Sequence, residues 1–443
     1  MRSRAAVDTL VLRGFSKSDW FLHRRFEAAE LLVVMDSFMW CGKPVNGTEE
    51  ERKTERSLGG FSVDHLRMHF HNVHIRTGDG PEVGIAELYG DLRDCRWLQD
   101  IGAHLPIGGR GPIRSGPVLV KGKEQSPVRI ASVRFDVDER RVVFNGITFG
   151  SDSTIERDAA QMGTEADLVA IAVDTARVED VRFAQGPTPV QLNAGRITVS
   201  GARFHVARDK RLPDPPFRYR PLAAGLLRAL PVGSGADTVL LHDVDVTYHE
   251  RAEDGAVFGK LPFHGINATI TGMRHFVDTT STVVEADGFL FDSAPVHLHL
   301  RTVSSDTTEH FVARASLRDL PMADLAPILQ PLTDVRPVSG WLSRIRVTME
   351  GDDRTGRGTV TMRYNDLRLA KGDKRNNGVG DAVGSALLNA LVRKRPRADA
   401  DRDREGAFVV ERRRDRSIFN MLWRSTREGA LNIMLPEVVA GKD

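Results

Sequence analysis

The feature that most constrains this chain is an eight-residue pattern that occurs seven times between residues 68 and 369. Each copy has two apolar residues at alternate positions, a small or polar pair, and two more apolar residues at alternate positions. Alternation with a period of two is typical of a half-buried β-strand. The copies are MHFHNVHI, VVFNGITF, ARVEDVRF, ITVSGARF, VLLHDVDV, LPFHGINA and MRYNDLRL, which begin at Met68, Val142, Ala176, Ile197, Val239, Leu261 and Met362.

Each central pair ends in Asn, Gly or Asp, the residues that tolerate a positive φ. One interpretation is a two-residue hairpin, in which Phe144 faces Ile147, Val142 faces Phe149, and all four side chains share one face. The other is a single long strand with a bulge at the central pair, which swaps the buried face halfway along. Asn-Gly is a strong turn signal, so we favour hairpins, and the bulged strand stays open as the alternative.

If the copies share an apolar face, they build a continuous apolar wall. Further strands are indicated at 128–137, 286–300 and 345–349, and two short helices at 222–230 and 323–332. The sequence therefore predicts a mainly β body over residues 1–370. The side chains expected to line its apolar wall are Val142, Phe144, Ile147, Phe149, Val199, Phe204, Leu241 and Val246.

The composition changes after residue 370. Apolar residues at helical spacing predict one helix over 379–391, and Ser417 is a plausible N-cap for a second helix that carries Phe419 and Trp423. Between them, residues 393–416 contain ten Lys or Arg and six Asp or Glu, a net charge of +4. Residues 371–443 are thus expected to form a helical appendage with a charged linker.

Composition excludes several functional classes. The 62 basic and 60 acidic residues nearly cancel, which does not indicate a nucleic-acid binder. Two cysteines, Cys41 and Cys95, exclude a disulfide scaffold or a multi-cysteine metal cluster, and they would pair only in an oxidising compartment. No secretory signal or membrane-spanning segment is apparent. We therefore expect either a cytoplasmic protein or a piece of a longer chain.

Signatures of enzymes are missing from the sequence. It has no phosphate-binding loop, nucleophile elbow, dinucleotide fingerprint or zinc-binding His-Glu-x-x-His, so we expect no catalytic residues and no cofactor. His65, His69, His71 and His74 are the best metal candidates, but solvent-facing strand histidines explain them better. No metal site is predicted.

Two groups of charged residues have the chemistry of lipid headgroup contact. Asp209 and its basic neighbours could meet a phosphate, although a solvated strand end is the simpler interpretation. The second group combines cations with aromatic rings, which lie at headgroup depth in membrane interfaces. Packing of the tail helix on the β body is the equal alternative. The membrane-contact residues predicted here are Arg412, Arg413, Arg414, Phe419 and Trp423.

Several segments of the chain resemble the AsmA-like envelope proteins, in the form found in Bacteroidota-type bacteria. The segment 316–374 resembles their C-terminal region, with Asp319-Leu320-Pro321, Ser339-Gly340, a Gly351-Asp352 turn, Gly358 and Tyr364-Asn365-Asp366-Leu367. The segments 207–251 and 412–431 are similar to the same family, the latter with Phe419, Trp423 and Gly429 in the expected pattern. The resemblance covers about residues 170–435.

The resemblance implies an elongated, curved antiparallel sheet with an apolar groove, located in the periplasm and associated with membranes. It further implies that the groove carries phospholipid acyl chains between inner and outer membranes and supports outer-membrane assembly. Envelope proteins are the candidate protein partners that it implies. The family's N-terminal anchor and signal do not occur at the start of this sequence.

Three functions follow for comparison. The first is a non-enzymatic lipid conduit, because a one-sided apolar wall shelters acyl chains at roughly 0.8 kcal/mol per methylene. The second is a structural or assembly scaffold of the envelope with no lipid cargo. The third, an enzyme, lacks a recognised constellation of residues. An open apolar surface would favour the first function, and interdigitated side chains at core density would favour the second.

Overall fold

The computed structural model describes residues 2–23, 25–42, 60–77, 80–97, 107–122, 126–151, 153–184, 191–230, 234–275, 280–333, 335–371 and 403–434. Internal contacts divide the chain into two compact units. Unit 1 comprises Met1–Gly150 and Ile171–Ser200, and unit 2 comprises Ser151–Ala170 and Gly201–Asp443.

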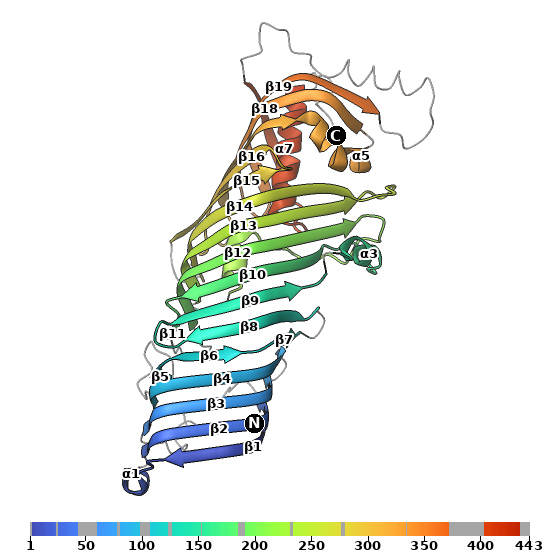
Figure 1. Cartoon of the computed structure of the whole chain (residues 1–443). Coiled ribbons are helices and arrows are strands. Elements are labelled where there is room, and N and C mark those ends of the chain that lie inside the picture. Colours follow the sequence, from blue (N-terminus) through green and yellow to red (C-terminus); the bar gives the residue numbers. More distant parts are fainter. Residues whose placement is uncertain are drawn as a thin grey trace. The chain divides into compact units, whose positions relative to one another are not determined.

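Unit 1 consists of strands that lie side by side, with one short helix (Figure 1). Two strands, β10 and β12, continue past the boundaries of the unit. The elements are β1 (Arg2–Arg13), α1 (Lys17–His23), β2 (Arg25–Gly42), β3 (Gly60–Thr77), β4 (Glu82–Trp97), β5 (Ile107–Arg110), β6 (Pro112–Ser115), β7 (Val118–Lys121), β8 (Val128–Asp136), β9 (Arg141–Phe149), β10 (Leu168–Glu179), β11 (Arg182–Ala184) and β12 (Gln191–Asp209).

Unit 2 combines long strands with short helices and one longer C-terminal helix. The helices are α3 (Ile155–Ala160), α4 (Ala223–Arg228), η1 (Met322–Leu325), α5 (Ala326–Thr333) and α7 (Ile418–Met434). The strands are β13 (Gly235–Arg251), β14 (Gly259–Arg274), β15 (Ser281–Leu290), β16 (Ala294–Val303), β17 (Phe311–Pro321), β18 (Val335–Gly351), β19 (Thr355–Lys371) and β20 (Arg404–Glu411).

The described strands form one long, mixed and mostly antiparallel sheet. Most strands pair with their neighbours in the sequence, as in the antiparallel series from β13 to β20. The pair β2 and β3 is parallel, with Arg25 opposite Gly60 and Gly42 opposite Thr77. The prediction of a mainly β body is therefore confirmed, and this parallel pair is an addition to it.

The predicted hairpins are wrong, because the copies of the repeated pattern lie along continuous strands. The copy at residues 142–149, for example, falls wholly inside β9. Only the copy at residues 176–183 is interrupted, at Asp180, and there β11 pairs with β12 instead of folding back onto β10. In every copy the second central residue has a positive φ: Asn72, Gly146, Asp180, Gly201, Asp243, Gly265 and Asp366.

These positive-φ residues act as local distortions of the kind that the alternative interpretation predicted. Some produce a register shift against the next strand, as near Asp243, where Leu241 and Val244 pair with Ala268 and Ile266. An extra or left-handed residue interrupts the alternation of side chains. The two apolar halves of each copy can therefore keep to one face of the sheet without a chain reversal. The swap of the buried face that the alternative interpretation expected is wrong for the copy in β9.

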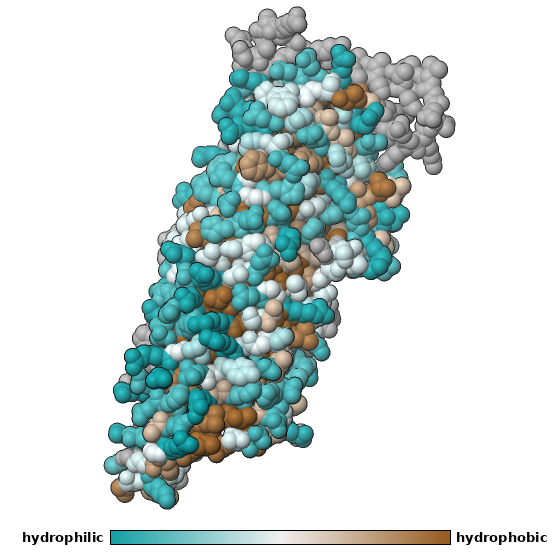
Figure 2. All heavy atoms as spheres, viewed as in Figure 1, coloured by the Kyte–Doolittle hydropathy of each residue, from teal (hydrophilic) through white to brown (hydrophobic). Residues whose placement is uncertain are grey.

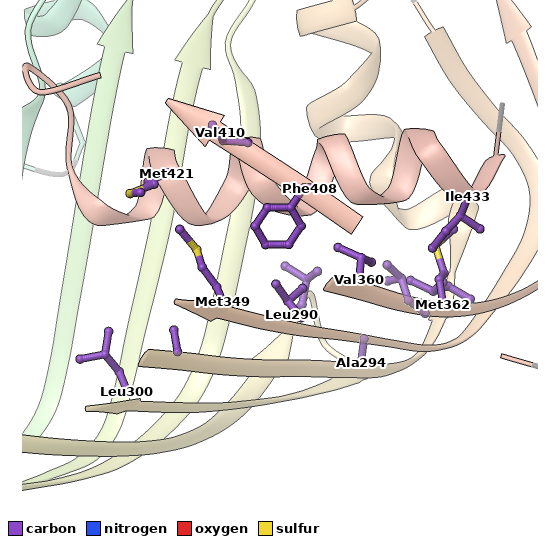
Figure 3. Close-up of a cluster of buried hydrophobic side chains, with 14 of the residues drawn as sticks. Leu290, Ala294, Leu300, Met349, Val360, Met362, Phe408, Val410, Met421 and Ile433 are labelled. Carbon is purple, nitrogen blue, oxygen red and sulfur yellow. The ribbon is translucent and has the colours of Figure 1, made fainter. Parts of the chain in front are cut away.

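A hydrophobic core in unit 2 lies between α7 and strands β15 to β20. In Figure 3, Met421 and Ile433 of α7 point toward the strands, and Phe408 of β20 lies between. The helix contacts β19 and β20, so α7 covers the apolar face of this part of the sheet. Packing on the sheet was one of the two expectations for this helix.

The described elements of residues 371–443 include strand β20 and helix α7. Helix α7 begins at Ile418, next to the expected N-cap Ser417. The charged linker expected over 393–416 instead contains strand β20, which pairs with β19. Its pattern of alternating burial explains this, because Gly406, Phe408 and Val410 are buried. The helix predicted over 379–391 lies outside the described residues.

Two smaller predictions are confirmed in unit 2. The helix expected over 222–230 is α4, and the helix expected over 323–332 corresponds to η1 followed by α5. The strand predicted over 286–300 is two strands, β15 and β16, which form a hairpin with Leu290 opposite Ala294.

Candidate functional site

Four rows of residues cross the strands of unit 1, and their side chains are apolar except at Ser115 and at Gly90, which has none. Each row is a series of directly opposed cross-strand partners, so its members lie on one face of the sheet. We name them rows A to D. Row A is Val33, Met68, Gly90, Ile113, Phe135, Val142 and Val178; row B is Met35, Phe70, Leu88, Ser115, Val133, Phe144 and Ala176; row C is Phe38, Val73, Ile85, Val118, Ile130, Ile147 and Val173; row D is Trp40, Ile75, Val83, Val120 and Val128, with Phe149 and Ile171 beyond it.

The four predicted residues of β9 each fall in a different row. Val142 belongs to row A, Phe144 to row B and Ile147 to row C, where they pair with Phe135, Val133 and Ile130 of β8. Phe149 pairs with Ile171 of β10 in row D. The sequence pattern therefore identified all the residues that β9 contributes to this surface.

A line of irregular positions separates row B from row C, and we call it the seam. At the seam β3 contains Asn72 with φ 47°, β9 contains Gly146 with φ 60°, and β6 is separated from β7 by Gly116 and Pro117. The register of β9 against β8 and β10 is the same on both sides of it. Adjacent strands are thus distorted at the same level, which preserves their pairing.

Exposure indicates that rows on both sides of the seam share one face. In a regular strand exposed positions are two residues apart. Across the seam the interval is three, from Ala131 to Arg134 in β8 and from Ala86 to Tyr89 in β4. The alternation therefore reverses at the seam, and the apolar positions before and after it point to the same side.

The rows are incompletely covered within unit 1. Most of their side chains are half-buried, while Val73, Val118 and Val173 are buried. Among the described helices, only α1 makes extensive contacts with a strand of this unit, and that strand is β2. Leu10 of β1, directly opposite Val33 of row A, is 64% exposed. Figure 2 shows apolar side chains gathered over the strands nearest the N-terminus.

The remaining four predicted wall residues lie on β12 and β13. Val199 belongs to unit 1 and Phe204 to unit 2, and both are half-buried. In β13, Leu241 pairs with Ala268 of β14. Val246 pairs with Phe263, which is also in β14, so both β13 residues have apolar partners.

A cavity of about 580 Å³ lies along the seam in unit 1. Its lining combines small residues such as Gly84 and Gly146 with the polar side chains of His74, Arg129 and Thr148. Row C contributes Ile85, Val118 and Ile130 to it. Much of the lining, such as Ala86, Ala131 and Arg129, lies at exposed positions outside the rows. The rows themselves cross more strands and are the better candidate surface for a long acyl chain.

An ion pair marks one end of β8. Asp136, which is buried, accepts hydrogen bonds from Arg134 at 2.9 Å and from Arg141 at 3.0 Å. The Arg134 guanidinium holds the pKa of Asp136 below its ordinary value, and Arg141 adds to this effect. A carboxylate beside row A is thus neutralised by its neighbours and leaves no free negative charge at the apolar surface.

Helix α7 has two different faces. Met421, Ser425, Gly429 and Ile433 are buried against the sheet, whereas Phe419 on the outer face is 70% exposed. Trp423, one turn later, is 49% exposed. The two predicted aromatic residues therefore face away from the core that the helix covers.

The arginines predicted beside these rings divide into two groups, one buried and one exposed. Arg412 is only 7% exposed, and its guanidinium donates to the backbone carbonyl of Arg220. Arg413 and Arg414 are exposed, although Arg414 pairs with Asp353 at 3.0 Å. Only these last two can meet a headgroup without unpacking of unit 2.

Arg208 and Asp209 of the charge run are also buried, which corrects the solvated interpretation for these two residues, whereas Lys210 is half-buried and Arg211 is exposed. Asp209 accepts hydrogen bonds from Arg211 and Arg251. Burial disfavours its charged form, but these guanidinium groups outweigh burial, and the pKa of Asp209 lies well below its ordinary value. Its neighbour Arg208 donates to Asp167 at 2.7 Å. These groups are engaged with one another and not with a headgroup.

The histidines of β3 are held by polar and aromatic neighbours. His65 Nε2 lies 2.9 Å from Asp91, and the ring of His69 stacks on Tyr89 with 4.0 Å between centroids. Within the described residues, no three His, Cys, Asp or Glu side chains are grouped to hold a metal ion. Cys41 and Cys95 are free thiols, the first exposed and the second buried.

Sequence reasoning missed most of the residues in rows A to D. It also missed the small residues through which α7 packs on the sheet. The signal for the rows was present, because VRIASVRF at 128–135 has the same pattern as the seven copies. The buried face of α7 was less visible, since Ser425 and Gly429 are not hydrophobic. None of the described helices is long and apolar enough to cross a membrane.

Comparison with known proteins gave no relative. No protein-family model matches this chain, and no curated protein matches it.

Proposed function

We propose that this protein binds lipid acyl chains on rows A to D and serves as a non-enzymatic lipid conduit of the Gram-negative envelope. The observation that carries the proposal is the continuity of rows A to C across β2 to β10. Acyl chains that leave a bilayer need an unbroken apolar surface, since each methylene exposed to water costs roughly 0.8 kcal/mol. The seam supports the proposal because it keeps all four rows on one face.

The resemblance to AsmA-like proteins supports the location and cargo in this proposal. It favours the periplasm, phospholipid as the cargo, and transfer between inner and outer membranes in support of outer-membrane assembly. The half-buried state of the row residues also supports it. Side chains that are only partly covered by protein have remaining area that a ligand can bury.

Helix α7 favours the scaffold as the second candidate function. It packs on the sheet at backbone distance, as a closed protein core does. A scaffold without lipid would need the rows of unit 1 to be covered in the same way by protein. The two functions therefore differ in what covers rows A to D.

The test is to purify the protein from bacterial membranes with a mild detergent and identify the retained phospholipid by mass spectrometry. Phe144→Asp places a charge in row B, which is expensive on an apolar surface. Thr148→Asp adds the same charge to the exposed side of the same strand and is the matched control. Arg141 is unsuitable as a control, because it pairs with Asp136.

We expect retained phospholipid in the wild type and in Thr148→Asp, and a loss of most of it in Phe144→Asp. Equal retention by the two variants would contradict a conduit along the rows. A wild type without any phospholipid would favour the scaffold. Circular dichroism of both variants establishes that the sheet is intact.

A further inference from the structure

The loop that follows β12 meets the segment before α7, and exposed aromatic and basic side chains surround their junction. We define the junction patch as the exposed residues of 211–220 and 413–427 in unit 2. The backbone N–H of Arg220 donates to the carbonyl of Arg414 at 2.9 Å, which joins the two segments. Tyr219 lies beneath two cations, 5.5 Å from Arg412 and 5.0 Å from Arg414.

Buried ion pairs hold this junction in place. Arg416, one residue before the N-cap of α7, donates to Glu165 at 2.9 Å, and both side chains are buried. The Glu165 backbone N–H donates to the carbonyl of Pro213 at the start of the loop. These bonds to buried residues of unit 2 therefore fix the positions of the loop and of the start of α7. The outer side chains of both segments are exposed to solvent.

The outer side chains are unusual for a water-exposed surface. Phe217 is 73% exposed, and Phe419 and Trp423 are exposed on α7. Three large exposed aromatic rings are costly to leave in water. Arg218, Arg413 and Arg427 are exposed among them.

The charge of the patch favours an anionic partner. The exposed residues of the patch include five Arg and one Asp, a net charge of +4. Among the acids near these cations, Asp353 pairs with Arg414, Asp415 with Arg413 and Arg416, and Asp214 lies 3.9 Å from Arg416. Glu411 and Glu428 are adjacent to the patch in the sequence. Aromatic rings interleaved with exposed arginines match the membrane interface, where rings insert at headgroup depth and cations meet anionic lipid.

We infer that the junction patch docks unit 2 onto the surface of an anionic membrane. The inference deepens the proposed lipid function by naming where the protein meets a bilayer, and it rests on separate residues from rows A to D. The inner face of α7 remains packed on the sheet while its outer face contacts lipid, so docking requires no unfolding of the helix.

The test measures flotation of the full chain with vesicles of phosphatidylcholine alone or with added phosphatidylglycerol. We expect binding to the anionic vesicles only, and loss of binding at high salt. The double variant Phe419→Ser/Trp423→Ser and the single variant Phe217→Ser should each bind about tenfold more weakly. Val409→Ser is the matched control, because Val409 is 75% exposed on the face of β20 opposite α7.

A second measurement does not depend on the stability of a polar variant. Brominated lipids quench a tryptophan that lies at the bilayer interface, and Trp423→Phe keeps the aromatic ring while removing that fluorophore. We expect quenching in the wild type and markedly less in Trp423→Phe. Absence of vesicle binding, equal loss in Val409→Ser, or equal quenching in both proteins would overturn the inference.

The two proposals fail separately. Loss of vesicle binding with unchanged phospholipid retention would reject the junction patch alone. Vesicle binding by a protein that retains no phospholipid would reject the conduit alone.

Discussion

Gly429 of α7 lies so close to Val360 of β19 that a Cβ atom on Gly429 would come within 2.4 Å of Val360 Cγ2. Gly406 of β20 is equally crowded, since a Cβ there would lie 2.3 Å from the Gly429 carbonyl oxygen. The helix therefore approaches the sheet with backbone against backbone, and two glycines permit it.

This contact predicts an unusual effect of Gly429→Ala. In an exposed helix this substitution stabilises by about 1 kcal/mol, but here overpacking should lower the free energy of unfolding by about 1–3 kcal/mol. Urea unfolding followed by circular dichroism measures it. Arg427→Ala, on the exposed side of the same helix, should be almost neutral, and a more stable Gly429→Ala would contradict the described packing.

The seam predicts opposite results for two substitutions at one position. Asn72 has φ 47°, where glycine is unstrained and a β-branched residue is not. Asn72→Gly should leave stability nearly unchanged, whereas Asn72→Val should cost about 1–2 kcal/mol. Thermal unfolding of the two variants compares them directly, and equal stability would argue against a left-handed residue at the seam.

The repeated pattern shows what can and cannot be predicted from this sequence. Alternation identified the strands, and it also identified the β9 residues that take part in rows A to D. It did not choose between hairpin and bulge, because Asn145-Gly146 supplies the same positive φ to both. The deciding information lies in the partner strand, where Ile130 and Val133 pair with Ile147 and Phe144.

The low pKa of Asp136 predicts a pH dependence of stability. Its folded-state pKa is depressed, chiefly by Arg134, so the charged carboxylate stabilises unit 1 above the unfolded pKa of about 3.9. That contribution is lost as the pH falls through the lower folded-state pKa. We expect Asp136→Asn to cost on the order of 1–2 kcal/mol at pH 7 and to match the wild type at the acid limit.

Melting temperatures of the two proteins between pH 2 and pH 7 measure this effect. The difference between them should shrink steadily with acidification. A difference that stays constant over the whole range would show that the effect of Asp136→Asn is one of packing and not of charge.

The buried pair of Arg416 and Glu165 predicts a strong asymmetry between single and double variants. Glu165→Leu leaves the Arg416 guanidinium buried without this partner and should cost about 3–5 kcal/mol. Glu165→Leu combined with Arg416→Met should recover part of that loss, because it removes the unpaired Arg416 guanidinium. Buried Arg208, which lies 3.4 Å from Glu165, then keeps its bond to Asp167. Urea unfolding measures both variants.

The exposed pair of Arg414 and Asp353 is the matched control for this experiment. Arg414→Ala should cost less than about 1 kcal/mol, since solvent screens an exposed pair. A double variant as unstable as Glu165→Leu would contradict the expected compensation.

These buried charges were beyond prediction from the sequence. Arg412, Arg413, Arg414 and Arg416 form one basic run, and a run of this kind is ordinarily a solvated face. Arg416 bonds to Glu165, and the two residues are 251 positions apart in the sequence. Only the fold brings such partners together, so the sequence alone could not separate the two buried arginines from the two exposed ones.

Pairing between successive strands has a consequence for how such proteins change in length. Where each strand adds to the previous one in antiparallel order, as from β13 to β20, loss or gain of one adjacent strand pair leaves the chain direction at both flanks unchanged. A single strand could not be removed in the same way, because the direction of every later strand would reverse. Insertions and deletions in the genes for such sheets should therefore be tolerated in units of two strands, which makes the sheet's length adjustable in discrete steps.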